Sequence, residues 1–152
     1  MSVELKISQN IDIKETYNLL LLQINNLINV KDPLITNFSN ITAALKQTFE
    51  KISWVGFYFL KENRLYLGPF QGKVACTRIE LGKGVCGTSA LKKETQIVPN
   101  VHEFPGHIAC DIESNSEIVI PMIFNDKVWL EKICELISNK LVSNRNINLN
   151  LL

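Results

Sequence analysis

Three of the four cysteines in this 152-residue chain, Cys76, Cys86 and Cys110, lie in glycine-containing sequence. Cysteines gathered in one small domain can do two-electron redox chemistry: one thiolate attacks an oxidised substrate and becomes a sulfenic acid, and a second thiol closes a disulfide on it. Cys110 suits the attack best, because it follows a loop that contains Pro105 and Gly106, and loops often carry chemistry. Cys76 and Cys86 are both candidates for the second role.

Two further features can serve such a reaction. Glu117 lies seven residues after Cys110, and its carboxyl group can bind a substrate amine or donate a proton. Trp54, Phe57 and Tyr58 form an aromatic cluster that can wall a pocket for a thioether-like methyl group. Taken singly, Glu117 would be an ordinary exposed acid, and a tryptophan at the centre of a strand, such as Trp54, is more often a core residue than a pocket residue.

Histidine and cysteine residues together can also bind a metal ion. His102 and His107 accompany the cysteines, but the chain has no Cys-x-x-Cys pair and no close histidine spacing of the kind that binds zinc. The sequence therefore predicts no metal site. Cys134 lies in an apolar periodic stretch and is predicted to be a core residue.

Length, composition and charge narrow the class of protein. The chain is predicted to form one domain over residues 1–152, with 46% hydrophobic residues, and 16 basic against 15 acidic side chains predict neither nucleic-acid nor anionic-membrane binding. No apolar stretch near the start is long enough to span a bilayer, and residues 1–10 lack a signal-peptide core. We therefore expect a cytoplasmic protein, where persistent disulfides are rare and clustered cysteines are more often catalytic or metal-binding.

The hydrophobic periodicity predicts an α+β domain with a central antiparallel sheet and flanking helices packed on one side. The predicted helices cover residues 11–30, 34–52, 84–93 and 128–142, and the predicted strands cover residues 53–60, 64–67, 77–81, 95–98 and 117–124. The first two strands are expected to form a hairpin. Residues 143–152 are polar and rich in asparagine, and are predicted to be a disordered tail.

Five motifs agree in order and spacing with one known family. They are WVGFY at 54–58, LGPFQG at 67–72, GKGVCGT at 82–88, GHIACD at 106–111 and SEIV at 116–119. With them, the chain resembles the free methionine-(R)-sulfoxide reductases, which are enzymes with a GAF fold. The resemblance implies reduction of free L-methionine (R)-sulfoxide, no bound cofactor, thioredoxin and NADPH as the source of electrons, and a homodimer.

The resemblance also implies roles for individual residues. It makes Cys110 the nucleophile that becomes a sulfenic acid and Cys76 the cysteine that resolves it, with Cys86 as a further cysteine able to exchange disulfides. It places Glu117 and Trp54 in the substrate pocket, and we expect Tyr58, from the same motif as Trp54, to bind substrate as well.

The chain departs from the family after residue 124. Family members continue into a strand of the form Gly-Val-Leu-Asp-Ile-Asp-Ser, whose aspartates help to hold the substrate's ammonium group. Here residues 125–127 run directly into the stretch predicted to be the final helix. We therefore expect a sheet that lacks one strand, and an alternative function: a catalytically inactive or truncated GAF domain that binds a small molecule or a partner.

Overall fold

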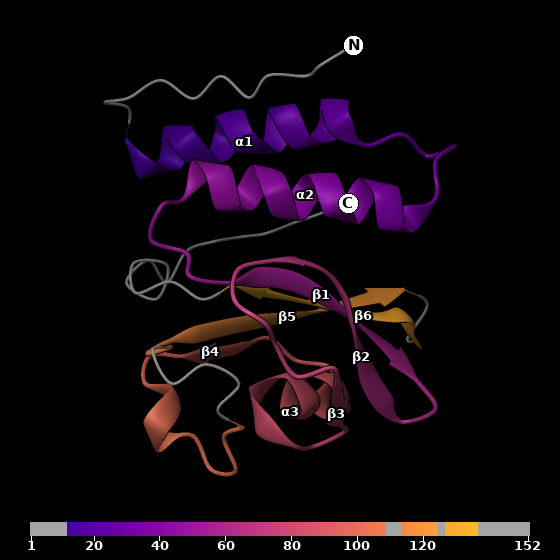
Figure 1. Cartoon of the computed structure of the whole chain (residues 1–152), viewed down its shortest axis with the longest axis vertical. Helices are drawn as coiled ribbons and strands as arrows, with labels where there is room; N and C mark the ends of the chain where they lie inside the picture. The colour runs from indigo at the N-terminus through magenta and orange to yellow at the C-terminus, as the bar shows by residue number, and fades with distance from the viewer. Residues whose placement is uncertain (1–11, 109–113, 125–126, 137–152) are drawn as a thin grey trace.

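The computed structural model describes residues 12–108, 114–124 and 127–136, the last of these by their backbone. It confirms the α+β class (Figure 1). The helices are α1 (Ile13–Leu27), α2 (Leu34–Thr48) and α3 (Gly84–Lys92), with a short 3₁₀ turn, η1 (Val101–Glu103). The strands are β1 (Val55–Lys61), β2 (Arg64–Gln71), β3 (Arg78–Glu80), β4 (Gln96–Val98), β5 (Glu117–Phe124) and β6 (Lys127–Leu136). None of the described helices meets the length and apolarity that a membrane span requires.

Polar side chains cap the first helix and tie the loop that follows it to the second. The carboxylate of Asp12 caps α1 by accepting a 2.8 Å hydrogen bond from the backbone N–H of Glu15. Between α1 and α2, the buried Asn37 side chain accepts from the N–H of Asn29 and donates to its carbonyl, both at 3.0 Å. Because α1 and α2 are joined by so short a loop, they pack side by side and bury Leu20 and Ala44 between them.

The predicted hairpin is confirmed as β1 and β2. Lys61 pairs with Arg64, which leaves Glu62 and Asn63 as a two-residue turn, and both have positive φ, 51° and 63°. Two consecutive residues in this conformation match the right-handed twist of the flanking strands. β2 extends to Gln71, four residues beyond the predicted strand.

All six strands form one sheet in the order β3-β2-β1-β6-β5-β4. Alternate side chains of β1 enter different cores, because successive residues of a strand point to opposite faces. Phe57 packs with Phe38 of α2, at 4.2 Å between ring centroids, whereas Tyr58 packs with residues of α3. The sheet therefore separates two hydrophobic cores.

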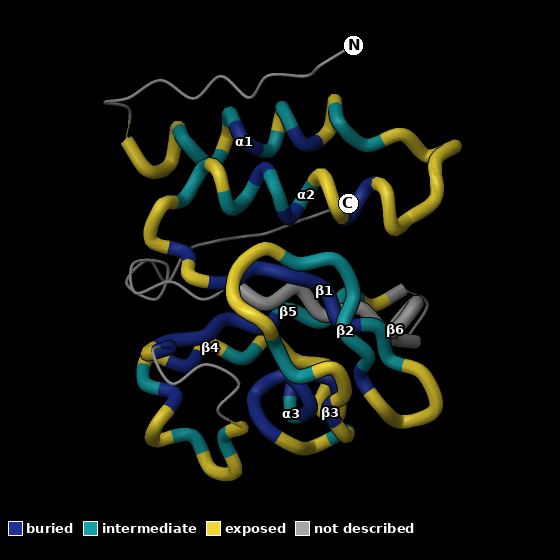
Figure 2. Tube along the Cα trace, in the orientation of Figure 1, coloured by how far each residue is buried: buried dark blue, intermediate teal, exposed yellow. Residues whose placement is uncertain are grey.

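The helices cover both faces of the sheet, so the expectation that they pack on one side is wrong. α1 and α2 cover the face of Phe57, and α3 lies on the face of Tyr58 (Figure 1). In Figure 2 the buried part of α3 faces the sheet. Hydrophobic periodicity reports that a helix buries one side, but it does not report which face of a sheet receives that side.

Residues 128–136 form a strand, so the predicted helix is wrong for them. The expectation that the sheet lacks a strand after residue 124 is also wrong. Residues 128–136 belong to β6, which pairs with Val55–Phe59 of β1 on one side and with β5 on the other. Without β6, both neighbours would leave backbone N–H and C=O groups unpaired in the middle of the sheet. This pairing outweighs a local helical pattern. The rest of the predicted helix, 137–142, and the predicted tail, 143–152, lie outside the described residues.

Glycine 87 lets α3 approach the sheet closely. A Cβ atom at this position would lie 2.3 Å from the backbone carbonyl oxygen of Glu80 and 3.2 Å from the backbone nitrogen of Gly82. That nitrogen donates a 2.8 Å hydrogen bond to the carbonyl of Gly87. The first turn of α3 is thereby held against the chain that follows β3, which sets the position of Cys86 one residue earlier.

We expect Gly87→Ala to lower the free energy of unfolding by about 1–3 kcal/mol, because the new methyl group meets backbone atoms that cannot turn away. Urea unfolding of the purified chain measures this. Lys92→Ala, an exposed change in the same helix, should stay within about 0.5 kcal/mol of the unchanged protein. Equal stabilities of the two variants would contradict the close approach.

Candidate active site

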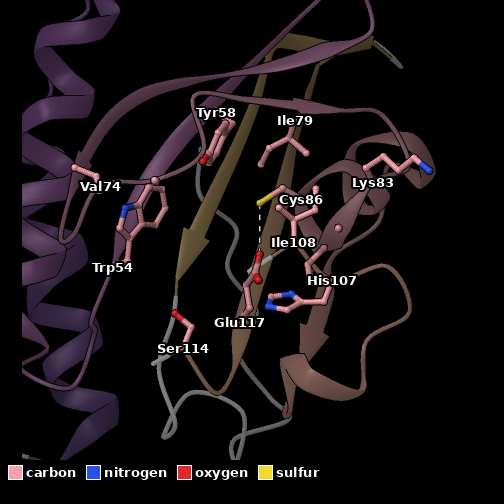
Figure 3. Close-up of a pocket in the computed structure, with 13 residues that line it drawn as sticks. Trp54, Tyr58, Val74, Ile79, Lys83, Cys86, His107, Ile108, Ser114 and Glu117 are labelled. Carbon is pink, nitrogen blue, oxygen red and sulfur yellow. Dashed lines mark hydrogen bonds between the residues drawn. The ribbon is translucent and has the colours of Figure 1, made fainter. Parts of the chain in front are cut away.

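One pocket lies between α3, the start of β5 and the aromatic end of β1 (Figure 3). Four of the six predicted site residues line it, namely Trp54, Tyr58, Cys86 and Glu117. Cys76 lies beside it, since the preceding residue Ala75 is part of the lining. Cys110 falls outside the described residues.

Glu117 and Cys86 meet inside this pocket. Glu117 is the first residue of β5 and is only 7% exposed, and Cys86 is the third residue of α3 and 4% exposed. The Cys86 thiol donates a hydrogen bond to Oε1 of Glu117, with 3.4 Å between the heavy atoms (Figure 3). The interpretation of Glu117 as an ordinary exposed acid is therefore wrong, because this residue is buried.

Tyr58 connects the sheet to the loop that holds Cys76. Its ring is 1% exposed, and its hydroxyl donates a 2.8 Å hydrogen bond to the backbone carbonyl of Cys76. Cys76 is disulfide-bonded and Cys86 is not, so the bridge does not join these two cysteines. Tyr58 thus lines the pocket with its ring and uses its hydroxyl to hold the Cys76 loop.

Several buried polar atoms of the lining have no hydrogen-bond partner among the described residues. They are Nε1 of Trp54, both ring nitrogens of His107 and Oγ of Ser114. Leaving a buried polar group unsatisfied costs about 1–3 kcal/mol. Three side chains from separate segments have such unsatisfied atoms in the lining of one pocket. A ligand with polar groups could form the missing hydrogen bonds, so the pocket is suited to a polar ligand.

The surroundings of His107 favour the uncharged form of its imidazole. Burial, and secondarily the neighbouring His102, lower the pKa of His107. The two imidazole rings meet edge to face, with 6.4 Å between centroids. A neutral imidazole has one N–H donor and one acceptor nitrogen, so His107 can offer both to a ligand in the pocket.

His107 and Ser114 are pocket residues that the sequence reasoning did not assign. From the sequence, His107 was considered only as a zinc ligand. It belongs, however, to the same motif as Cys110. Among the described residues, no group of three or more histidine, cysteine, aspartate or glutamate side chains is arranged to hold a metal ion. Ser114 precedes the SEIV motif and carried no signal of its own.

Two exposed apolar side chains line the pocket, together with one exposed lysine, Lys83. Val74 is 86% exposed and Ile108 is 39% exposed, and both line the pocket (Figure 3). Trp54 stacks on Phe70, with 5.6 Å between ring centroids, and gives the interior an aromatic wall. A small ligand with a hydrocarbon part and several polar groups fits this combination of surfaces.

Lowering the pH from about 7.5 to about 5 should reduce the free energy of unfolding through His107. The pKa of His107 is lower in the folded chain than in the unfolded chain, so below about pH 6.5 the unfolded state binds a proton more readily and gains stability. His107→Gln should make the fall smaller in urea unfolding at the two pH values.

His102→Gln is the matched control, because it removes only the smaller of the two causes of the shift. It should reduce the pH dependence less than His107→Gln does. If unchanged protein and His107→Gln lose the same stability between the two pH values, the buried environment assigned to this ring is wrong.

Comparison with known proteins gives the family. The free methionine-R-sulfoxide reductase of Saccharomyces cerevisiae is 48% identical over 126 residues, which are 78% of this chain and 70% of that protein. The solved structure of the free methionine-R-sulfoxide reductase of Neisseria meningitidis in complex with its substrate has a TM-score of 0.80 at 35% identity, covering 91% of this chain and 80% of that one.

A solved GAF-domain structure has a TM-score of 0.81 at 43% identity, covering 89% of this chain and 80% of that chain. No family model matches the chain. The identity to the yeast enzyme extends over most of both proteins, and the folds agree. The chain therefore belongs to the free methionine-R-sulfoxide reductase family, a family of oxidoreductases, and has the GAF fold.

Proposed function

We propose that this protein reduces free L-methionine (R)-sulfoxide to L-methionine with its own cysteines. The observation that carries the proposal is the lining of the pocket: a buried carboxyl group, Glu117, together with polar atoms of Trp54, His107 and Ser114 that no described residue satisfies. Free methionine sulfoxide carries an ammonium group, a carboxylate and a sulfoxide oxygen beside a hydrocarbon chain. Each of these groups has a counterpart of matching chemistry in the lining.

Glu117 makes the free amino acid a better ligand than a methionine sulfoxide within a polypeptide. A carboxylate attracts an ammonium group, and the free amino acid has one next to the side chain that reacts, whereas a residue inside a polypeptide has a neutral amide there. Trp54 contributes a ring face for the methyl and methylene groups and an N–H that can donate to an oxygen of the substrate. Tyr58 adds a second aromatic wall.

The proposed reaction has two steps at the protein. The Cys110 thiolate attacks the sulfoxide sulfur, the oxygen takes up a proton, and methionine leaves as Cys110 becomes a sulfenic acid. The thiol of Cys76 then gives up its proton, attacks the Cys110 sulfur as a thiolate and forms a disulfide with it, and the oxygen leaves with that proton as water. Two electrons and two protons pass in total from the pair of thiols to the substrate oxygen.

A dithiol must then reduce the disulfide before the next turnover. We propose thioredoxin, regenerated with NADPH, as this reductant, and no bound cofactor in the enzyme. The hydrogen bond from the hydroxyl of Tyr58 to the carbonyl of Cys76 holds in place the loop that carries this disulfide-bonded cysteine. The proposal includes a homodimer, on the resemblance to the family, and keeps the cytoplasmic location expected from the sequence.

NADPH consumption by the purified chain, coupled to thioredoxin and thioredoxin reductase, tests the function. We expect turnover with free methionine (R)-sulfoxide, and at least about a hundredfold less with the N-acetylated substrate, because the acetyl group removes the ammonium charge from a buried carboxylate. Cys110→Ser should abolish turnover. Cys134→Ser, a change at a cysteine outside the proposed chemistry, should retain it.

The alternative function is an inactive GAF domain that binds a small molecule. It is favoured by the composition of β6, which contains glutamate but no aspartate. The resemblance implies aspartates after residue 124 that help to hold the substrate's ammonium group, and β6 does not supply them. Titration calorimetry with free methionine sulfoxide separates the two: binding by a cooperatively folded chain that gives no turnover would support the alternative and overturn the proposed enzyme.

A further inference from the structure

The two cysteines that the structure describes next to the pocket are in different chemical states. Cys76 is disulfide-bonded, whereas Cys86 is not part of a disulfide. Cys86 lies in the first turn of α3, 4% exposed, in the same core cluster as Val85 and Ala90. Its thiol is packed as tightly as the apolar side chains beside it.

The neighbour of this thiol is unsuited to a nucleophile. A resolving cysteine acts as a thiolate, but Sγ of Cys86 lies 3.4 Å from Oε1 of Glu117. An anionic sulfur at this distance would repel an ionised carboxylate in a site from which water is largely excluded. A protonated thiol, by contrast, donates its hydrogen to that oxygen. The geometry favours a thiol that keeps its proton.

We propose that Cys86 is a positioning residue: its S–H group fixes the carboxyl group of Glu117 in the orientation that receives the substrate, and it takes no part in disulfide exchange. This inference rests on the proposed function, in which Glu117 binds the ammonium group. It leaves the redox steps to Cys110 and Cys76. A backbone that closely approaches the sheet at Gly87 places the thiol where it can donate.

Serine and alanine at position 86 separate a hydrogen-bonding role from a redox role. Cys86→Ser keeps an O–H donor, so its KM for free methionine (R)-sulfoxide should stay within about threefold of the unchanged enzyme. Cys86→Ala leaves the carboxyl group without this donor, and KM should rise about tenfold or more, with a smaller change in kcat. A resolving thiol would be lost equally in both variants, so equal loss of thioredoxin-dependent turnover overturns the proposal.

Thiol mapping gives a readout that does not depend on rates. After one turnover without thioredoxin, the chain is denatured, alkylated and digested, and the cysteine-containing peptides are identified by mass spectrometry. We expect Cys86 to be alkylated as a thiol. Recovery of Cys86 in a disulfide as the main product of that turnover overturns the proposal.

A double-mutant cycle keeps the inference testable if the proposed function itself fails. The free energy of unfolding is measured by urea for Cys86→Ala, Glu117→Ala and the double variant. A hydrogen bond between the two side chains predicts a coupling of at least about fivefold in the unfolding equilibrium constant. Additive effects would overturn the contact between Cys86 and Glu117, whereas absence of turnover with coupling intact would overturn only the enzymatic role.

Discussion

The burial of the Glu117 carboxyl group is the constraint on which the pocket depends. Removing a carboxyl group from water costs free energy unless protein groups replace the water. Glu117 begins β5, pairs in register with Val98 of β4, and receives the thiol of Cys86 from α3. One helix and two strands must therefore be in place together before this group has its environment. The pocket therefore forms only when the whole domain folds, because no single segment of the chain contains all of its parts.

A single strand supports both halves of the molecule. β1 directs Phe57 toward α2 and Tyr58 toward α3, so the helical layer and the pocket share one backbone. The hydroxyl of Tyr58 extends this support to the Cys76 loop. Side chains that never touch a ligand, such as Phe38 stacked on Phe57, thereby help to hold the aromatic wall of the pocket. Close packing of this kind transmits small displacements across a sheet.

The hairpin of β1 and β2 could be predicted from its local sequence, whereas the strand β6 could not. The turn between β1 and β2 contains asparagine, which tolerates positive φ, between two runs of apolar and aromatic residues. The segment 128–136 has apolar residues at helical spacing, yet its backbone forms β6 between two strands that each need a partner. The edge of β1 that pairs with β6 lies far earlier in the sequence, so no window around residue 130 contains it, although β5 directly precedes β6.

The sequence by itself determined the family and most of the residue types of the site, because five motifs agree in order and spacing with the family and four of them contain glycine, cysteine or aromatic residues. It also identified Glu117 and Trp54 as pocket residues through the resemblance. Only the tertiary structure decided that the carboxyl group of Glu117 is buried, that Cys86 donates to it, that Tyr58 holds the Cys76 loop, and that His107 and Ser114 complete the lining. The reason is that hydrogen-bond partners and burial depend on chain segments tens of residues apart, which meet only when the sheet and α3 have formed.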